Sequence, residues 1–559
     1  MIEAKATDTL VDRLWAHADQ RPDDVFCHLY SDGGVDPLSW SRLRGEASAH
    51  ARMLGAAGVK PGEVVLLFIP HGPSLFPPYF GAMALGAVPS YMPLPSMKQD
   101  PELYWSSHQV LFDRIKPAAV LTTREHLKAM GEVFDLSGPT AFLAIEDADL
   151  SDLSAIAPVP TLDDLALLQH SSGTTGLKKG VALSHRAIKT QLDSYSRALA
   201  LTSADGIASW LPVYHDMGLI ACTLLPVYAG LPLVSLDPFH WLAKPGLLLE
   251  AAAEHGSTLI WLPNFAFQHL TRVAPPRRLG ISDLGFVRAF INCSEVCRAA
   301  TFDAFQTTYG PIGLRRDQLQ ICYAAAETVY AISQTSVGEG ARVLTVDAEA
   351  LGDGRVEVLA EGTEAGQCLL SCGRMIDALD VRIVDDEGAA RPQGQTGEVT
   401  VTGASLFDGY YNLPEITERK LRDGRYFTSD LGFVHEGELY VLGRRDDVIV
   451  VNGRNYMAHD LEAVANRVLG LKPGRNVALG VPNERLGSND ICFVAELDPE
   501  ADEAAREAAG GALREALLNH ADAPAADIQV VEPGWLVKTT SGKISREKNL
   551  QKYLEVFGI

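Results

Sequence analysis

The chain has 559 residues, which is too long for a single hydrophobic core and predicts roughly three or four structural units. Hydrophobic residues make up 47% and charged residues 21%, an ordinary composition for a soluble globular protein. The net charge of −23 argues against a nucleic-acid-binding protein, which needs a basic face to neutralise backbone phosphates.

Neither the N-terminal segment nor the apolar runs of the chain indicate a membrane protein. Met1–Asp8 lacks the charged and then apolar pattern of a signal peptide. No apolar run approaches the ~20 residues that a spanning helix needs. The most apolar segment, Tyr79–Pro95, is interrupted by glycines and prolines and predicts a buried helix followed by a strand or loop. We therefore expect a cytoplasmic protein without a membrane span.

The eight cysteines are scattered along the chain without a C-x-x-C pair or a Cys/His cluster. This pattern does not favour structural zinc, and we expect reduced, mostly buried thiols.

Residues 1 to about 360 alternate between helix-like and strand-like patterns. Short apolar runs that suit strands covered on both faces lie at Glu63–Ile69, Ala118–Thr122, Thr258–Leu262 and Val287–Ile291. Helix-like segments between these runs favour an α/β architecture with largely parallel sheets.

From about residue 368 to 443 the pattern changes to short alternating strands and turns. Strands are expected at Asp380–Val384, Glu398–Val401 and Glu438–Val441. This spacing predicts a compact β subdomain.

A charged junction, Arg444–Asp447, precedes an expected strand at Val448–Val451. Beyond it, Asp502–His520 is helix-like, Ile528–Val531 suits a strand, and a last helix begins near Ser545. We therefore expect an N-terminal domain over residues 1–443 and a small α+β domain over residues 444–559.

The segment Ser171–Gly180 carries three glycines, four hydroxyl groups and two lysines between two apolar runs. Small residues let the backbone N–H groups approach a ligand, and hydroxyls and lysine add donors and charge, which suits a polyphosphate. The segment is not the common P-loop, because the pattern G-x-x-x-x-G-K-[ST] cannot be fitted: Lys179 is followed by Gly180 and Val181 and not by Ser or Thr. The same composition is also typical of a flexible turn.

Four more side chains have both a functional and an ordinary interpretation. His215 next to Asp216 suits either a reactive histidine or a buried, hydrogen-bonded one. Glu327, after small residues, is either a Mg²⁺ ligand beside a polyphosphate or part of a helix turn. Asp430 either binds ribose hydroxyls or caps a turn. Lys543, on a Gly-containing loop, is either functional or merely solvated.

The order and spacing of these segments resemble the adenylate-forming superfamily of acyl-CoA synthetases, nonribosomal-peptide adenylation domains and luciferases. The resemblance covers nearly the whole chain. It rests on Ser171–Gly180, Tyr323–Thr328, Asp430, Gly443–Asp447 and Lys543.

Within that superfamily the chain looks most like the fatty acyl-AMP ligases. Glu327 and Gly373 are 46 positions apart, and an added segment here, from about Arg342 to Thr363, is a mark of that branch. Other segments similar to it are Tyr214–Gly218, Leu262–Ala266, Asn292–Glu295 and Leu370–Gly373.

The resemblance implies two α/β sheet subdomains and a small β-barrel-like subdomain in the N-terminal domain, followed by a mobile C-terminal domain. It implies ATP-dependent activation of a carboxylic acid, fatty or bulky and hydrophobic, as acyl-AMP. The acyl group then passes to a phosphopantetheine thiol of CoA or an acyl carrier protein, with Mg²⁺ as the metal.

The resemblance also implies the roles of individual residues. Lys543 and His215 are the catalytic residues, Asp446 is the hinge, and Glu327 and Thr174 are the expected metal ligands. The acyl pocket would include Leu219, Phe265 and Phe267. The nucleotide site would comprise Ser171, Ser172, Gly173, Thr174, Thr175, Gly176, Lys179, Ser294, Glu295, Tyr323, Ala324, Glu327, Thr328, Asp430 and Arg444.

The chain departs from the usual family pattern at Lys178, Ala324, Val296 and Met457–His459. One alternative is an acyl- or aryl-CoA ligase, including one specialised for making the thioester from preformed acyl-AMP. Another is a non-catalytic nucleotide-binding protein, although retention of Lys543, Glu327 and Asp430 speaks against it.

Overall fold

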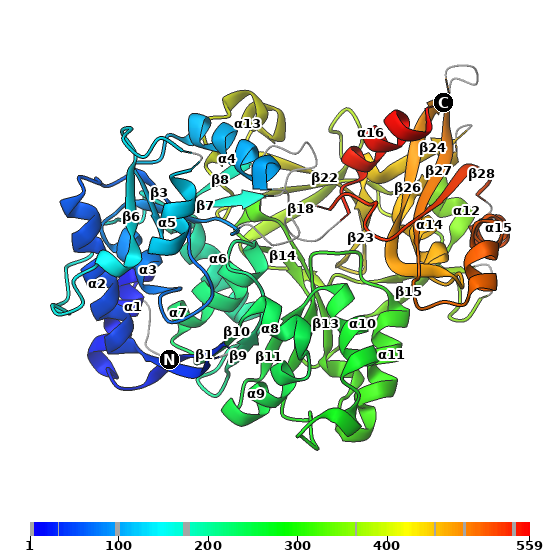
Figure 1. Ribbon diagram of the computed structural model, residues 1–559. Coiled ribbons are helices and arrows are strands. Elements are labelled where there is room, and N and C mark those ends of the chain that lie inside the picture. The colour runs from blue at the N-terminus through cyan, green and yellow to red at the C-terminus, as the bar shows by residue number, and fades with distance from the viewer. Residues whose placement is uncertain are drawn as a thin grey trace.

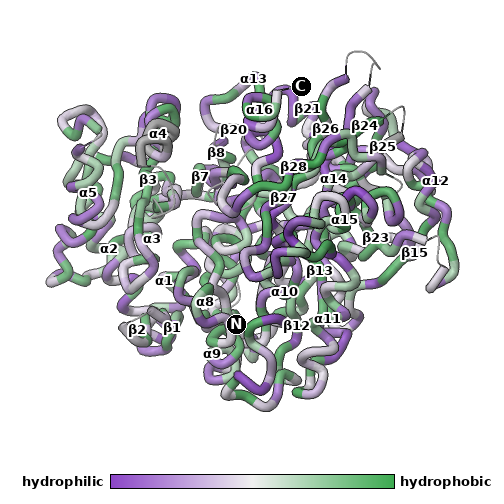
Figure 2. The backbone as a smooth tube through the Cα atoms, turned by 45° about the vertical axis from the view of Figure 1, so that its right-hand side comes forward, coloured by the Kyte–Doolittle hydropathy of each residue, from purple (hydrophilic) through white to green (hydrophobic). Residues whose placement is uncertain are grey.

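The computed structural model describes residues 5–31, 33–94, 101–132, 134–171, 179–363, 366–451, 454–483, 488–521, 523–538 and 544–558. In Figure 1 the blue and cyan N-terminal elements lie at the left of the molecule and the orange and red C-terminal elements at the upper right. Hydrophilic and hydrophobic stretches alternate along the tube in Figure 2, and no helix within the described ranges is long and apolar enough to cross a membrane.

A small parallel sheet has the strand order β4–β3–β5–β6. Its strands are β3 (Val64–Phe68), β4 (Val88–Tyr91), β5 (Ala119–Thr122) and β6 (Ala141–Ala144). The segment predicted as a buried helix and strand forms α3 (Pro77–Ala84) and β4, every residue of which is buried. Apolar runs bounded by Pro and Gly therefore located these elements correctly.

The large sheet follows one path, β18–β19–β22–β23–β17–β14–β13–β12–β11–β9–β10–β1–β2. The strands from β13 to β1 pair in parallel, as the apolar runs predicted. Their bounds are β1 (Val25–Ser31), β2 (Gly34–Ser39), β9 (Ile207–Ser209), β10 (Leu233–Leu236), β11 (Leu259–Leu262), β12 (Ala289–Asn292) and β13 (Leu319–Ala324). The flanking helices include α1 (Leu10–Gln20), α2 (Trp40–Ala56), α6 (His185–Ala198), α8 (Pro238–Ala243), α9 (Leu247–His255), α10 (Asn264–Val273) and α11 (Ala299–Tyr309).

The β-rich part that was expected to resemble a barrel instead continues the large sheet through antiparallel pairs. No closed barrel occurs in the part of the chain that the structure describes, because this path ends at β18 without returning to its start. The strands are β14 (Ala331–Gln334), β17 (Arg374–Met375), β18 (Leu379–Val384), β19 (Gly397–Gly403), β21 (Leu421–Arg422), β22 (Arg425–His435) and β23 (Glu438–Arg444).

A three-stranded sheet, β20–β8–β7, carries the Gly- and hydroxyl-rich segment. β7 (Leu165–Ser171) and β8 (Lys179–Ser184) are antiparallel, with Ser171 opposite Lys179, and β20 (Gly409–Tyr410) pairs with β8. The register therefore brings the two ends of the segment together.

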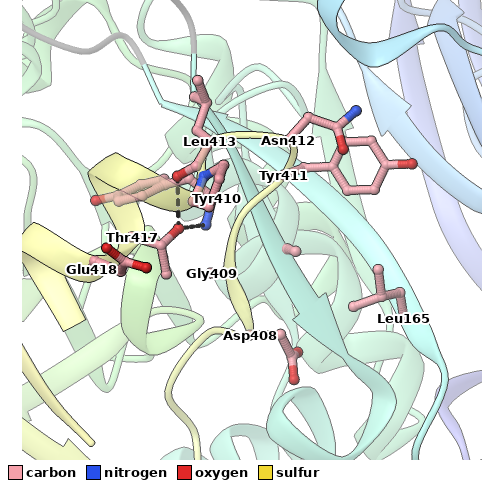
Figure 3. A pocket seen from close by; sticks show the side chains of 11 residues that line it. Leu165, Asp408, Gly409, Tyr410, Tyr411, Asn412, Leu413, Thr417 and Glu418 are labelled. Atoms are coloured by element: carbon pink, nitrogen blue, oxygen red, sulfur yellow. Dashed lines mark hydrogen bonds between the residues drawn. The ribbon is translucent and has the colours of Figure 1, made fainter. Parts of the chain in front are cut away.

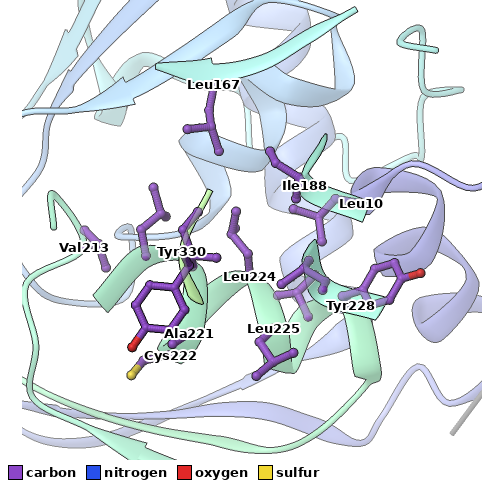
Figure 4. Packing of buried hydrophobic residues seen from close by; sticks show 14 of the residues in the cluster. Leu10, Leu167, Ile188, Val213, Ala221, Cys222, Leu224, Leu225, Tyr228 and Tyr330 are labelled. Atoms are coloured by element: carbon purple, nitrogen blue, oxygen red, sulfur yellow. The ribbon is translucent and has the colours of Figure 1, made fainter. Parts of the chain in front are cut away.

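Buried side chains from α1, β7, α6 and the neighbouring π-helix and α7 form the central core (Figure 4). The π-helix covers Met217–Leu224, and α7 covers Leu225–Ala229. Leu10, Leu167 and Leu224 are all buried in this cluster.

The C-terminal part contains two packed clusters whose buried members all lie at or beyond Ile449. This supports the domain boundary at 443/444, which remains a prediction. The elements are β24 (Val448–Val451), β25 (Arg454–Met457), α14 (Ala458–Ala465), β26 (Leu471–Asn483), β27 (Ser488–Leu497), α15 (Glu503–Ala521), β28 (Ala525–Val531) and α16 (Arg546–Phe557).

The expected additional segment folds as β15 (Val343–Asp347) and α12 (Ala348–Gly352), with β15 paired to β16 (Gly366–Leu370). Its apolar side chains pack on Phe433, Tyr440 and Leu442 of the large sheet, together with Met457 from the C-terminal part. The segment thus contacts both parts of the molecule.

Candidate active site

A cleft of about 4310 Å³ lies between the carboxyl ends of the central strands, the β-rich part and the C-terminal elements. Crevices at this edge of a parallel sheet are where α/β proteins commonly bind ligands. Predicted site residues that line it are Lys179, His215, Phe265, Ser294, Glu295, Tyr323, Ala324, Glu327, Asp430, Arg444 and Asp446.

Several predicted residues cannot be placed. Ser172–Gly176, which includes the expected metal ligand Thr174, and Lys543 lie outside the described residues. Ser171 ends β7, opposite Lys179. Lys538 and Ile544, which flank the Lys543 loop, pair with each other, and both line the cleft.

Asp430, on β22, is held by residues from two other strands of the large sheet, β23 and β13. The antiparallel register of β22 and β23 sets it opposite Arg444, whose Nε lies 3.4 Å from Asp430 Oδ1. The Tyr323 hydroxyl donates to Asp430 Oδ2. Burial raises the pKa of the Asp430 carboxyl, while Arg444 and the Tyr323 hydrogen bond oppose the rise. The result is an oriented acceptor at the cleft wall.

Glu327 lies in a short 3-10 turn, Ala326–Thr328, that ends at Val329. Val329 has φ +68°, an unusual value for a β-branched residue, which fixes the chain reversal at this point. The Tyr410 hydroxyl donates to Glu327 Oε1 at 2.7 Å. Thr328, predicted to bind nucleotide, is buried and its hydroxyl lies 2.9 Å from the Ala325 and Tyr330 carbonyl oxygens, which gives it a role in this turn.

Tyr410 itself is anchored from its far side. Its backbone N–H donates to Thr417 Oγ1 at 2.9 Å, and that hydroxyl lies 3.0 Å from the Leu413 carbonyl (Figure 3). Both partners belong to the start of α13 (Pro414–Lys420). A hollow of about 470 Å³ separates this region from Leu165 and Asp408. No local sequence pattern indicated Tyr410, because its contact with Glu327 joins residues 83 positions apart.

Lys179 stands at the start of β8 with its ammonium 5.4 Å from the centre of the Tyr410 ring. Burial lowers its pKa, and the charges of Lys420, Arg419 and Arg444 lower it further, while Glu327 raises it. This wall of the cleft therefore carries a surplus of positive charge in an otherwise acidic protein.

His215 lies on a loop that leads into the π-helix, and it lines the cleft. Gln169 Nε2 donates to the Tyr214 carbonyl at 2.9 Å, and Asp216 Oδ1 accepts from the Met217 N–H at 2.8 Å. Asp216 thus caps the helix, and this capping fixes the turn on which His215 stands.

Ser294 follows β12 with φ +77°, and Glu295 Oε2 accepts from the Phe265 N–H at 3.3 Å. β12 and β13 pair in parallel with Asn292 opposite Ile321, so Ser294 and Tyr323 emerge at the same edge of the sheet. The two segments expected to surround the adenine therefore meet here.

Of the three expected acyl-pocket residues, Phe265 lines the cleft and has a 42% exposed side chain. It lies against Trp210, which is stacked on Trp241 at 3.7 Å. Leu219 and Phe267 are 1% and 0% exposed and belong to the packed cores. In the structure they therefore lie behind the cleft wall on which they were expected. Helical spacing on the π-helix and α10 turns these two side chains inward.

Direct contacts join the two parts of the molecule beside the cleft. Arg298 Nη2 donates to the His459 carbonyl at 2.7 Å and lies 3.2 Å from Asp460 Oδ1. Gln367 Nε2 donates to Asp460 Oδ2 at 3.4 Å. Asp446 is exposed and lies in the turn Arg445–Asp447 that joins the two parts.

The sequence profile of the AMP-binding enzyme family matches residues 14–411, and the chain belongs to this family. It is 30% identical over 539 residues to the medium-chain-fatty-acid–[acyl-carrier-protein] ligase JamA of Moorena producens. The aligned region covers 93% of this chain and 90% of that protein. These matches confirm the predicted superfamily and the prediction of an enzyme.

Solved structures agree with the fold. One from work on fatty acyl-adenylate ligases of E. coli and L. pneumophila has a TM-score of 0.89 at 25% identity, with 98% of both chains covered. The fatty acyl-adenylate ligase of L. pneumophila in complex with acyl adenylate and pyrophosphate has a TM-score of 0.76 at 26% identity, covering 98% of this chain and 96% of that one. The predicted α/β fold with a large N-terminal and a small C-terminal part is confirmed.

Gly218 tests the packing beneath His215. A Cβ at this position would lie 2.3 Å from the Pro212 carbonyl oxygen and 2.9 Å from that of Leu211, both backbone atoms. We expect Gly218→Ala to lower the free energy of unfolding by about 1–3 kcal/mol, measured by denaturant unfolding, because the backbone must move.

Gly511→Ala is the matched control, since α15 leaves open space around Gly511. It should leave stability unchanged or raise it by up to about 1 kcal/mol. Equal stabilities of Gly218→Ala and the wild type would contradict the close packing of this turn.

Proposed function

We propose that this protein uses ATP to activate a fatty or bulky hydrophobic acid as acyl-AMP and then transfers the acyl group to a phosphopantetheine thiol. The observation that carries the proposal is that one cleft is lined by Glu327, by Lys179 and by the paired Asp430 and Arg444. The relatives named for fatty acyl-adenylate chemistry support it. Because ATP and CoA or carrier-protein thiols are its substrates, we also propose a cytoplasmic location.

In the first step a carboxylate oxygen attacks the α-phosphorus of ATP, a P–O bond forms, and the bond to the leaving pyrophosphate breaks. The main barrier is repulsion between an anion and a polyanion, so fixed cations contribute most. Lys179, at the end of the Gly- and hydroxyl-rich segment, supplies such a charge for the β- and γ-phosphates. Lys543 would bridge the carboxylate and the phosphate oxygens, with His215 near the α-phosphate.

The nucleoside would lie across the carboxyl ends of β12 and β13. Tyr323 would contact the adenine, with Ser294 and Glu295 along its edge. Asp430 and Arg444 would hold the ribose hydroxyls, for which the Tyr323 hydrogen bond and the strand register already orient the carboxylate.

The donor set fits Mg²⁺. Glu327 offers a carboxylate that accepts one hydrogen bond from Tyr410 and retains further lone pairs, and Mg²⁺ in such sites takes few protein ligands besides phosphate oxygens. When bound with Glu327 and Thr174, the ion would neutralise phosphate charge.

In the second step a thiol attacks the acyl carbon and AMP leaves. We infer that the C-terminal part turns about Asp446 between the steps, since this residue is exposed and lies in the short turn Arg445–Asp447 that joins the two parts. The contacts of Arg298 and Gln367 with Asp460 would then belong to one of the two arrangements.

Loss of the Lys543 ammonium tests the first step. With an acid that the wild type accepts, Lys543→Ala should lower carboxylate-dependent ATP–pyrophosphate exchange by about a hundredfold or more, the usual cost of removing a group that stabilises transition-state charge. Thioester formation from supplied acyl-AMP should be largely retained.

Lys548→Ala, on the exposed face of α16, is the matched control and should exchange like the wild type. Exchange by Lys543→Ala at a near wild-type rate would refute its role. A wild-type protein that exchanges with no fatty, aryl or polycyclic acid would refute the proposed function.

A backbone constraint at Asp446 tests the second step. Proline fixes φ near about −65°, so Asp446→Pro should keep pyrophosphate exchange and lose thioester formation. Asp446→Ala keeps the backbone free and should retain both activities. Holo-acyl carrier protein and free CoA would be compared as acceptors; loss of both steps together in Asp446→Pro would argue against the hinge.

A further inference from the structure

Lys420 is a second lysine on the wall of the cleft near Lys179. It ends α13, and its Nζ reaches across to β22, where it donates to Ser429 Oγ and lies 3.4 Å from the Phe427 carbonyl oxygen. Both partners are neutral, so neither compensates the charge of the ammonium. In the described part of the chain, no carboxylate forms an ion pair with Lys420 or Lys179.

Ser429, the acceptor for Lys420, is itself unusual. Its φ of +66° is uncommon for a residue other than glycine, and its N–H donates to Glu398 Oε1 at 2.8 Å. Such backbone conformations persist where surrounding contacts enforce them, and they cluster at ligand sites. Here the strained residue directly precedes Asp430.

Lys420 acts electrostatically on both sides of the cleft. Its charge lowers the pKa of Asp430, in opposition to the dominant effect of burial. With Arg419, it also adds to the lowering of the Lys179 pKa that burial causes. Its charge therefore acts both on Asp430, in the expected ribose site, and on Lys179, in the expected phosphate site.

We propose that Lys420 is a further phosphate-binding residue of this enzyme, which contacts the pyrophosphate portion of ATP together with Lys179. The inference rests on the proposed function, because it takes ATP as the bound polyphosphate. An ammonium has three donors, of which the Ser429 and Phe427 oxygens take two at most, so one remains for a phosphate oxygen. A polyanion would relieve the repulsion between the two lysines.

The test compares ligands that do and do not carry the pyrophosphate portion. Dissociation constants of MgATP, pyrophosphate, AMP and CoA would be measured by calorimetry for the wild type, Lys420→Met and Lys420→Arg. We expect Lys420→Met to raise the dissociation constants of MgATP and pyrophosphate by about tenfold or more, the effect of losing a charge-assisted hydrogen bond. The dissociation constants of AMP and CoA should change by less than about twofold. Lys420→Arg should bind MgATP nearly as well as the wild type.

Thermal unfolding of the unliganded proteins separates binding from folding. Lys420→Met should unfold near the wild-type temperature, because the loss of the hydrogen bond to Ser429 is offset by the removal of repulsion with Lys179. The exposed Lys128→Met, on α5 (Arg124–Met130), is the matched control and should bind every ligand like the wild type.

Three results for Lys420→Met would overturn the inference. These are unchanged MgATP binding, an equal loss of affinity for AMP and MgATP, and a larger loss of affinity for CoA than for MgATP. Equal weakening would mean that Lys420 only positions the Ser429–Asp430 turn. Failure of the wild type to bind MgATP would instead refute the proposed function, and the inference with it.

Discussion

The pairing of β22 with β23 is the constraint on which the site depends. Its register sets Asp430 opposite Arg444, and the Tyr323 hydroxyl from β13 ties this pair to the edge of the parallel strands. A buried carboxylate is costly without such partners, so these contacts both allow its burial and orient it. The β-rich extension of the sheet would thus build one half of the proposed nucleotide site.

Positive charge near the Asp430–Arg444 pair gives the cleft its chemical character. Lys179 and Lys420 both line the cleft, and neither forms an ion pair with a described carboxylate, although the protein as a whole carries a charge of −23. Desolvated cations bind anions more strongly than solvated ones, and fixed cations need little reorganisation when charge develops on a phosphate. The arrangement is therefore suited to a polyphosphate substrate.

Much of the fold could be predicted from the sequence because it depends on local patterns. Apolar runs between Gly and Pro located the parallel strands, and the ordered motifs identified the family. Contacts between distant segments could not be predicted in this way. Tyr410 contacts Glu327 only once the chain has folded, because 83 positions separate them. Leu219 and Phe267 point into the core because of the way their helices are turned about their axes. The described β-rich strands pair with the large sheet and form no closed barrel. The alternating pattern of a strand does not specify which strand it pairs with, so this could not be predicted.

Acyl-AMP formation in this cleft is tested most directly by following a carboxylate oxygen. A fatty acid that the protein turns over would be labelled with ¹⁸O in both carboxyl oxygens, and AMP and pyrophosphate would be analysed by mass spectrometry after thioester formation. Attack on the α-phosphorus predicts one ¹⁸O atom in AMP and none in pyrophosphate. Unlabelled AMP, or label in pyrophosphate, would contradict an acyl-AMP intermediate.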